Sequence, residues 1–524
     1  MKVLICDPIA EEGVEFLQKH AEVDIKLKQK PEDLLAIIGG YDAVVVRSET
    51  KITAEAIQKA GRLLAIGRAG IGVDNIDVEA ATQRGIVVVN APTGNTIAAA
   101  EHAVALMLAL ARHIPQACAA LKSGVWERSS FVGTELRNKT LGVVGLGNVG
   151  SEVTRRVQGF QMRVVAYDPF VSPEYTRNLG VEPVSLDELL KTSDFITFHL
   201  PLTESTRGLI GKKQLGMVKP SVRLVNCARG GLIDEKALLQ AIKESKVAGA
   251  AMDVFATEPD TDNPLFESDK VIVTPHLGAS TEEAQSGVAV DVANQIVEVL
   301  EGRPAKYAVN APFISAEVFP VLAPYLKAAS MLGRLTAQLA EGQMSELDIS
   351  YEGDVSEYDT AALKAGVIGG LLETTTEERV NLVNAEVMAQ RRGLKVTEHK
   401  SRTCENYSSL MTVRATTSAG EMYVGGSVMR GETHIVRINE YWFDLAQTEG
   451  YFLFVDHRDR PGLIGAVGTI AGKADVNISF MELSRLQARG PALMVLALDE
   501  ALGDQQCQEI MDLSDIHSVK MVRL

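Results

Sequence analysis

Short runs of aliphatic residues alternate with helical periodicity along the first part of the chain. Val3–Cys6, Ala43–Val46, Leu63–Ile66 and Val87–Val89 have the pattern of buried strands, with amphipathic segments between them. This alternation predicts a parallel sheet with helices on both faces. One long helix is expected after it, from Ile97 to Lys122.

A second alternating series begins at Lys139. Its expected strands are Thr140–Val144, Arg163–Tyr167, Phe195–Phe198, Arg223–Asn226, Gly249–Met252 and Val271–Thr274. Repeats of this length are typical of a doubly wound sheet. A helix from Glu282 to Glu301 should then return the chain to the first sheet. The pattern therefore predicts two Rossmann-like domains, with residues 97–282 inserted between residues 1–96 and 283–310.

The rest of the chain has a different pattern. Between Phe313 and Thr448, "ISY", "YEGDV" and "VRINEYWFDL" suggest strands, while Asp359–Ile368 and Thr376–Arg392 suggest helices. From Tyr451 the order is β-α-β-β-α-β, a compact unit with a split βαβ arrangement. We expect a mixed α+β intervening domain over 311–449 and a βαββαβ domain over 450–524.

Composition narrows the choice of partners. A chain of 524 residues with a net charge of −16 should form several domains and repel nucleic acid. The "MKVLICDP" start lacks the layout of a signal peptide, and Ala98–Ala111 is too short for a bilayer. The cysteines are far apart and form no CxxC pair, which favours reduced thiols in a cytoplasmic protein without structural zinc: Cys6, Cys118, Cys227, Cys404 and Cys507. We expect no membrane partner and no metal.

The stretch "LGVVGLGNVGSEVTRRVQGFQMRVVAYDP" predicts a dinucleotide site. Gly145, Gly147 and Gly150 follow a strand and open a helix, and Asp168 ends the next strand. The glycines would let a pyrophosphate approach the helix N-terminus. A carboxylate at Asp168 would accept ribose hydroxyls and repel a 2′-phosphate, which favours NAD over NADP. Taken alone, a glycine turn of this kind is also compatible with close helix–sheet packing.

Three stretches after expected strands carry candidate chemistry: "NCARGGLID", "AMDVFATEPD" and "TPHLGAST". His276 can accept the hydroxyl proton, because imidazole titrates near neutral pH. Glu258 can hold its ring, and Arg229 can bind a substrate carboxylate through two donors. Each residue alone could be an ion-pair partner or a packed side chain. Together at strand ends they indicate a hydride-transfer site.

These motifs, with "GRAGIGVDNID" (67–77) and "NAPTGNTIAAAEHAVALMLALAR" (90–112), resemble the NAD-dependent D-2-hydroxyacid dehydrogenases. Over its full length the chain resembles the long members of that family. The resemblance implies oxidation of D-3-phosphoglycerate to 3-phosphohydroxypyruvate, the first step of the phosphorylated L-serine pathway. Two alternatives stay open: a glyoxylate or hydroxypyruvate reductase, and an NAD-sensing protein of the corepressor type.

The resemblance also implies roles for individual residues. The cofactor would be bound by Gly145, Leu146, Gly147, Asn148, Val149, Gly150, Asp168, Cys227, Arg229, Asp253, His276 and Gly278, with Asp253 near the nicotinamide carboxamide. The substrate would be bound by Arg47, Arg68, Asn95, Arg128, Arg229 and His276. The chain would form a homodimer or a homotetramer, in which Arg128 and Trp126 reach the active site of the neighbouring subunit. Trp126 could equally be a buried anchor of the subunit interface. Several arginines suit a phosphorylated hydroxyacid, which carries about three negative charges.

The last domain resembles an ACT domain, carried by "DHRDRPGLIGAVGTIAGKADVNISFMEL". In serine-sensing members this implies L-serine as effector, held here by His457, Asp459 and Asn477 between two subunits. The alternative is that Asp459 and Asn477 cap a helix and a turn. Residues 311–449 resemble the family's intervening domain, which in some members binds an anion or, allosterically, the substrate. Arg391 and Arg392 fit a solvated helix face better than such a site.

Overall fold

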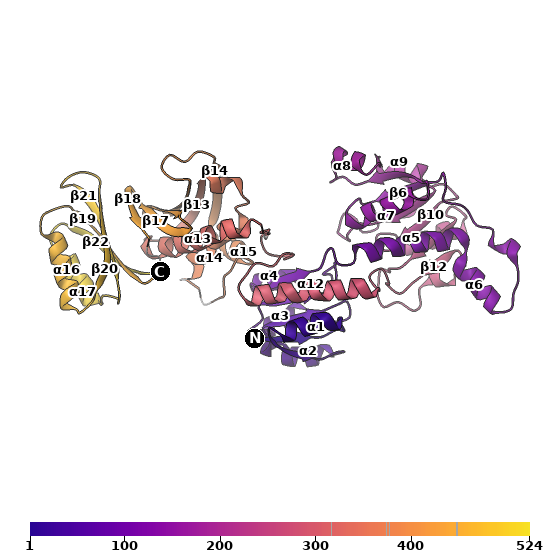
Figure 1. The fold of residues 1–524 in the computed structure, drawn as a ribbon, viewed down its shortest axis with the longest axis horizontal. Helices are drawn as coiled ribbons and strands as arrows, with labels where there is room; N and C mark the ends of the chain where they lie inside the picture. The colour runs from indigo at the N-terminus through magenta and orange to yellow at the C-terminus, as the bar shows by residue number, and fades with distance from the viewer. Residues whose placement is uncertain (316, 374, 377, 447–448) are drawn as a thin grey trace.

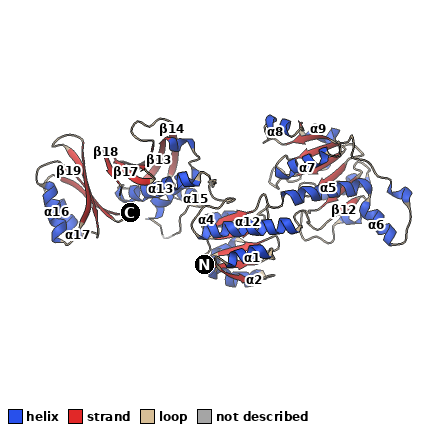
Figure 2. Cartoon of the chain, viewed as in Figure 1, coloured by secondary structure: helices blue, strands red, loops and turns tan. Residues whose placement is uncertain are grey.

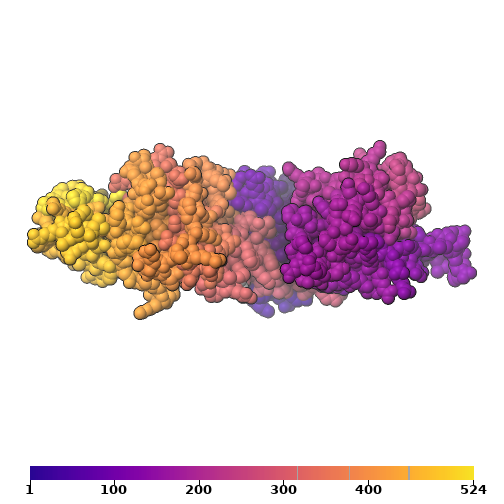
Figure 3. Space-filling view, turned by 90° about the horizontal axis from the view of Figure 1, so that it is seen from above, coloured from indigo at the N-terminus to yellow at the C-terminus, as the bar shows by residue number. Residues whose placement is uncertain are grey.

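The computed structural model describes residues 1–315, 317–373, 375–376, 378–446 and 449–524. The backbone forms four sheets, one in each expected domain. The four domains are arranged in a row in an elongated molecule. The second domain lies at one end and the C-terminal domain at the other (Figure 1). The first domain lies between the second and the third, and the space-filling view shows the four parts in contact (Figure 3).

The first domain is a parallel sheet in the order β2-β1-β3-β4-β5. Its strands are β1 (Lys2–Ile5), β2 (Glu22–Ile25), β3 (Ala43–Val46), β4 (Ala65–Arg68) and β5 (Val87–Asn90). Its helices are α1 (Glu11–Gln18), α2 (Pro31–Ile37), α3 (Ala54–Lys59), α4 (Val78–Gln83) and α12 (Glu282–Leu300). Strand β2 is polar and was not expected.

The return of helix α12 to the first domain is confirmed. A Cβ on Gly13 of α1 would lie 2.8 Å from the Cβ of Ala289, and one on Gly67 of β4 would lie 2.6 Å from Val292. Both glycines therefore let α12 approach the first domain closely. The inserted domain is thus bounded by helices at the domain border.

The second domain is a seven-stranded parallel sheet in the order β12-β11-β10-β9-β6-β7-β8. Its strands are β6 (Thr140–Val144), β7 (Arg163–Tyr167), β8 (Glu182–Pro183), β9 (Phe195–Phe198), β10 (Arg223–Asn226), β11 (Gly249–Met252) and β12 (Val271–Val273). Its helices are α5 (Thr96–Arg112), α6 (Ile114–Lys122), α7 (Asn148–Gln158), α8 (Pro173–Asn178), α9 (Leu186–Thr192), α10 (Lys212–Leu215) and α11 (Glu235–Lys243). Helices cover both faces of the sheet (Figure 2). The expected strands are confirmed, with β8 in addition.

The expected helix from Ile97 to Lys122 is wrong, because the chain breaks between α5 and α6. His113 has a left-handed conformation, with φ of 54°, and Pro115 lies in the first turn of α6. A left-handed residue cannot continue an α-helix. Helix α6 then leaves the body of the domain, as Figure 1 shows, and buries none of its residues.

Among the described residues, no single helix is both long and apolar enough to cross a bilayer. The pair α5 and α6, bent by 62°, meets that criterion only when the two are taken together.

The intervening domain is a mixed sheet in the order β14-β13-β15-β16-β17-β18, in which only β13 and β14 pair in parallel. Its strands are β13 (Met344–Gly353), β14 (Lys395–Ser401), β15 (Ser409–Thr417), β16 (Gly420–Met429), β17 (Glu432–Ile438) and β18 (Tyr441–Leu445). Its helices are α13 (Phe319–Leu339), α14 (Ala361–Glu373) and α15 (Ala385–Arg391).

One local expectation for this domain needs correction. The helix expected over 376–392 begins only at Ala385; its residue 377 lies outside the described residues. A hydrogen bond from the Asn384 side-chain amide to the carbonyl of Arg379 holds residues 379–384 in a turn instead. The stretch "VRINEYWFDL" is a hairpin of β17 and β18, because Asn439 takes a left-handed conformation with φ of 49°.

The C-terminal domain has the expected βαββαβ order and an antiparallel sheet, β20-β21-β19-β22. Its elements are β19 (Tyr451–Arg458), α16 (Leu463–Lys473), β20 (Ile478–Arg485), β21 (Pro491–Leu498), α17 (Asp504–Met511) and β22 (Ile516–Arg523). One sheet face is covered by α16 and α17. On the other face Phe452, Phe454 and Val495 join the apolar core of the intervening domain. The last two domains therefore share one core.

Candidate active site

A cavity of about 1060 Å³ lies between the first two domains. In the second sheet the strand order reverses between β6 and β9, and open α/β sheets bind ligands at such a point. The cavity is lined from the first domain by Arg47, Lys51 and Arg68, and from the second by Cys227, Arg229 and His276. The residues that the sequence spread over 230 positions therefore meet in one cleft.

The glycine turn has the geometry that a dinucleotide site needs. Gly145 has a φ of 94°, and a Cβ on Gly150 would lie 2.2 Å from the Gly145 carbonyl oxygen. No atom lies within 4 Å of a Cβ added at Gly147, so this position is open to a ligand. Asn148 and Val149, at the start of α7, line the cavity.

Asp168 closes this turn from the end of β7. Its carboxylate accepts hydrogen bonds from the backbone amides of Leu146 (2.8 Å) and Phe170 (2.9 Å). The carboxylate therefore fixes the glycine turn as well as offering acceptors to a ligand.

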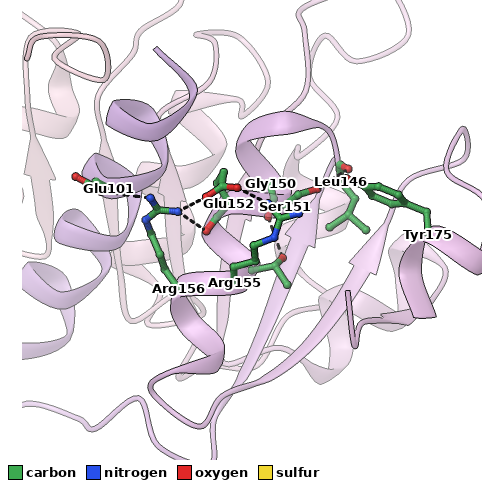
Figure 4. Close-up of polar contacts among 9 residues, drawn as sticks. Glu101, Leu146, Gly150, Ser151, Glu152, Arg155, Arg156 and Tyr175 are labelled. Atoms are coloured by element: carbon green, nitrogen blue, oxygen red, sulfur yellow. Dashed lines mark hydrogen bonds and ion pairs between the residues drawn. The ribbon is translucent and has the colours of Figure 1, made fainter. Parts of the chain in front are cut away.

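Helix α7 is held in place at several points, which Figure 4 shows. The Ser151 hydroxyl donates to the Leu146 carbonyl at 3.2 Å and lies 2.8 Å from the Tyr175 hydroxyl. On the other side Arg156 bonds Glu101 of α5 at 3.3 Å. These contacts fix α7, the helix that follows the glycine turn, to the segments packed against it.

His276 and Glu258 form a pair on the second domain's side of the cleft. The Nδ1 of His276 lies 2.7 Å from Oε2 of Glu258. A carboxylate only accepts, so Nδ1 carries the hydrogen and Nε2 is left to exchange a proton with a substrate. Burial opposes the charge of Glu258, but hydrogen bonds from His276 and the Phe255 amide outweigh it and lower its pKa.

The backbone of His276 is left-handed, with φ of 56°, which is uncommon for a residue with a Cβ. Its amide donates to the carbonyl of Asp253 at 2.8 Å. The Asp253 carboxylate accepts from the next two amides, Leu277 at 2.7 Å and Gly278 at 2.9 Å. The unusual conformation is therefore held by Asp253.

Asp253 itself is buried and does not line the cavity. Burial opposes its charge, but hydrogen bonds from His102, Thr274 and Leu277 outweigh it and lower its pKa. Cys227, which lines the cavity, has a pKa raised well above its usual value by burial and by Asp253. The thiol therefore stays protonated.

Four cations line the cavity: Arg47, Lys51, Arg68 and Arg229. Burial, followed by the like charge of Arg229, lowers the pKa of Arg68 to about 10. The Nε of Arg68 is buried without a hydrogen-bond partner among the described residues. A desolvated guanidinium beside like charges favours an anionic ligand.

Small residues and carboxylates position these cations. A Cβ on Gly70 would overlap the Arg68 guanidinium, and one on Gly72 would lie 2.3 Å from Nη2 of Arg229. Buried Asp7 accepts from the Arg47 amide at 2.6 Å. Asp74 of the first domain lies 3.5 Å from Nε of Arg229, so an ion pair spans the cleft.

Asn95 also lines the cavity, and its Oδ1 is buried without a hydrogen-bond partner in the described chain. Arg128 and Trp126 do not reach this cleft within one chain. They lie beyond α6, where the Trp126 side chain is 77% exposed. Lys51 and His199 line the cavity but were missed from the sequence, where a lone lysine in "SETKIT" and a histidine in "FHLPL" carry no specific signal.

The three candidate effector residues do not meet within one chain. His457 is buried, and its Nδ1 donates to the Val455 carbonyl at 3.0 Å. Asp459 pairs with Arg485 at 3.0 Å, and the Asn477 amide donates to Asp499 at 2.8 Å. Asn477 precedes the end of β20 that pairs with Leu498, whereas His457 pairs with Ala492. These residues therefore lie at opposite ends of the sheet.

Comparison with protein families matches two parts of the chain. Residues 104–278 match the D-isomer specific 2-hydroxyacid dehydrogenase, NAD binding domain. Residues 321–439 match the D-3-phosphoglycerate dehydrogenase intervening domain. The pair of His276 and Glu258 lies within the first match.

Two solved structures that match this chain cover its first three-fifths. A glyoxylate reductase from Paecilomyes thermophila is 32% identical with a TM-score of 0.55, over 59% of this chain and 98% of its own. A D-lactate dehydrogenase from Aquifex aeolicus complexed with NAD and lactic acid is 28% identical with a TM-score of 0.54, over 60% of this chain and all of its own.

Full-length similarity is found to proteins named D-3-phosphoglycerate dehydrogenase. That of Synechocystis sp. is 47% identical over all of this chain and 95% of its own length. That of Archaeoglobus fulgidus is 44% identical over the full length of both chains, and that of Bacillus subtilis is 39% identical over all of this chain and 99% of its own. The chain therefore belongs to the D-3-phosphoglycerate dehydrogenase family, within the D-isomer specific 2-hydroxyacid dehydrogenases.

Proposed function

We propose that this enzyme oxidises D-3-phosphoglycerate to 3-phosphohydroxypyruvate with NAD. One observation carries the choice of substrate: four cations line a single cleft in an acidic protein, and the Nε of Arg68 is buried there without a hydrogen-bond partner in the described part of the chain. The substrate carboxylate needs only one pair of N–H donors, and the Arg229 guanidinium supplies that pair. The remaining three cations suit a phosphate.

The residues of the second domain fit the cofactor. The open face of Gly147, the amides at the start of α7 and the carboxylate at Asp168 would hold its pyrophosphate and adenosine ribose. Bound NAD supplies the acceptor for the hydride of the hydroxyl-bearing carbon. We place Cys227 and Gly278, which line the cavity, on the nicotinamide side of this site, with buried Asp253 behind them.

The chain's own residues handle the proton and the charge. Nε2 of His276 takes the hydroxyl proton, and the Glu258 carboxylate stabilises the positive ring that results. Arg229 holds the substrate carboxylate and, in the reverse direction, polarises the carbonyl. Arg47, Lys51 and Arg68 hold the phosphate from the first domain. We assign Asn95 to the substrate as well, and Arg128 to the neighbouring subunit's cleft.

A pair of assays tests this assignment. Reduction of phosphohydroxypyruvate by NADH should exceed reduction of glyoxylate and of hydroxypyruvate in kcat/KM by at least about 100-fold, because the phosphate contacts are charge-assisted. His276→Ala should lower kcat by at least about 100-fold with little change in NADH affinity. Equal activity on glyoxylate would favour a reductase for small 2-ketoacids, and NADH binding without turnover of any of them would favour a sensing role.

We also propose that the enzyme is a homo-oligomer regulated by L-serine through its last domain. The eight residue pairs that β19 forms with β21 separate the sheet end beside Asp459 from the end beside Asn477 by about 23 Å. An antiparallel pair of these sheets from two subunits would bring Asp459 of one near Asn477 of the other. A carboxylate and an amide can together bind the ammonium and carboxylate of a free amino acid.

The full chain must be used to test serine, because the last domain shares its core with the intervening domain. L-serine should inhibit the wild type, and Asn477→Ala should abolish inhibition without changing uninhibited kcat. No inhibition at millimolar L-serine would reduce the domain to a role in assembly.

The free cysteines favour a cytoplasmic location.

A further inference from the structure

His276, the proposed proton acceptor, is linked through Asp253 to a residue that is far away in the sequence, His102. His102 lies in the middle of α5, the helix that begins at the domain border. Its Nε2 lies 3.2 Å from Oδ1 of Asp253 and 3.4 Å from the Thr274 hydroxyl, across 172 residues of sequence in the second case. The His102 side chain is only 20% exposed.

The chemistry of Asp253 fixes the direction of this contact. A carboxylate only accepts hydrogen bonds, so Nε2 of His102 must carry a hydrogen and donate it. The same Oδ1 also accepts from the Thr274 hydroxyl at 2.6 Å and from the Leu277 amide at 2.7 Å. Three donors from two segments therefore converge on one buried oxygen.

This oxygen determines where the His276 backbone lies. The Asp253 carboxylate accepts hydrogen bonds from residues on both sides of His276. Thr274 precedes His276, and Leu277 and Gly278 follow it. His276 is held in a left-handed conformation, which is unfavourable for a residue with a Cβ unless the surrounding structure supports it. If the carboxylate moved, the ring of His276 would leave its position against Glu258.

We propose that His102 is a positioning residue for the hydride-transfer reaction: by donating to Asp253, it locks the loop that holds His276 at the cleft. This proposal rests on the proposed function only in that His276 exchanges the proton. It assigns a role to α5, whose neighbouring residue Glu101 binds Arg156 of α7 (Figure 4). Two adjacent residues of α5 would then have different partners: Glu101 contacts the glycine-turn helix α7, and His102 supports the loop that carries His276.

A metal site made by the same side chains fits the contacts less well. The donor atoms of His102, Cys227 and Asp253 lie within 4.8 Å of one another. However, both carboxylate oxygens of Asp253 already accept hydrogen bonds, and the raised pKa of Cys227 opposes the thiolate that a metal would bind. The contacts therefore favour a hydrogen-bonded support.

The test compares three variants at one position. His102→Gln keeps a nitrogen donor at nearly the same distance, whereas His102→Asn is too short and His102→Leu has no donor. We expect the Asn and Leu variants to lose at least about 10-fold in kcat, with the KM for NADH changed less than 3-fold. The Gln variant should retain kcat within about 3-fold of the wild type. Each kcat is divided by the number of sites that bind NADH, measured by fluorescence titration.

His20→Asn is the matched control, because it makes the same change at an exposed histidine just after α1 without reaching Asp253. It should leave kcat per NADH-binding site unchanged. Equal kcat in all three His102 variants would overturn the proposal, as would a loss in the Gln variant equal to that of Asn. If the Leu variant does not fold, the Asn and Gln variants still decide. Failure of the proposed function itself would appear differently, as a wild type without activity on 2-ketoacids.

Discussion

The pair of His276 and Glu258 shows how single side chains define the candidate reaction. The 2.7 Å contact assigns the hydrogen to Nδ1 and frees Nε2, so the ring can take a proton only on the side of the cleft. Burial opposes the charge of Glu258, but the hydrogen bonds from His276 and the Phe255 amide together outweigh it, so the pKa of Glu258 is lowered. Its charge is therefore present throughout the neutral range.

Removing that charge has a predictable effect on the pH profile. In Glu258→Gln the amide no longer stabilises a positive charge on the neighbouring ring. The acidic limb of the kcat/KM profile for hydroxyacid oxidation should therefore move to lower pH, while kcat falls about 10- to 100-fold. The measurement is initial rates from pH 5 to 9. An acidic limb that stays in place would show that Glu258 does not influence the proton acceptor.

Asp168 has an observed contact with the Leu146 amide and a proposed role, binding of the adenosine ribose; two substitutions can separate them. Asp168→Ala should weaken NADH binding by about 10- to 100-fold, because both the ribose acceptor and the Leu146 contact are lost. Asp168→Asn keeps an acceptor for Leu146 and removes only the charge, so NADH binding should fall less. Both variants should narrow the gap between NADH and NADPH in kcat/KM. If the wild type already used the two cofactors equally well, the role given to Asp168 would be wrong.

At the scale of elements, glycines set the contact between α13 and α14. A Cβ on Gly370 of α14 would lie 2.0 Å from the Ser330 carbonyl, and one on Gly333 of α13 would lie 2.0 Å from the Val367 carbonyl. The backbones of the two helices therefore touch at both points. The adjacent Gly369 has no atom within 4 Å of an added Cβ.

This contrast gives a matched pair of substitutions. Gly370→Ala should lower the free energy of unfolding of the intervening domain by about 1–3 kcal/mol, because the helices must separate. Gly369→Ala should raise it by up to about 1 kcal/mol through helix propensity. Urea titration followed by Trp442 fluorescence in a Trp126→Phe background reports this domain, since the chain has two tryptophans. Similar stability of the two variants would contradict the close helix contact, and kcat should not change in either.

At the scale of the whole molecule, the catalytic half should be more stable at neutral than at acidic pH. Burial lowers the pKa of His199 to about 4, and its Nε2 lies 3.0 Å from the Thr197 hydroxyl. An unfolded histidine titrates near 6.5. Between about pH 4 and 6.5 the unfolded chain therefore binds more protons than the folded chain. The stabilisation is complete above pH 6.5 and declines as the pH falls through this window.

The pH effect can be assigned by comparing variants. The free energy of unfolding should fall on the order of 2 kcal/mol between pH 7 and pH 4.5 through this group, since its ring is partly open to the cleft. His199→Gln should remove that part of the pH dependence. His20→Gln, which changes an exposed histidine, is the control. Urea titrations followed by circular dichroism give the values, and identical pH dependence in the two variants would refute the assignment.

The sequence was sufficient for the two doubly wound sheets and for the residues at their strand ends. Buried parallel strands read as aliphatic runs, and a glycine turn between strand and helix has one geometry. Because the carboxyl ends of parallel strands share one edge, Arg229, Glu258 and His276 could be expected to lie together. The polar strand β2 and the short β8 lacked such a signal.

Tertiary structure alone decided what surrounds those residues. The break at His113 depends on a left-handed backbone, and a helical periodicity continues through it. The support of His276 by Asp253 and His102 joins segments 151 and more residues apart, and no local pattern records such contacts. The same is true of Lys51 in the cleft and of the apolar face of the last sheet, which is covered by the intervening domain. Local pattern specifies each element, whereas side-chain contacts between distant elements depend on how those elements pack.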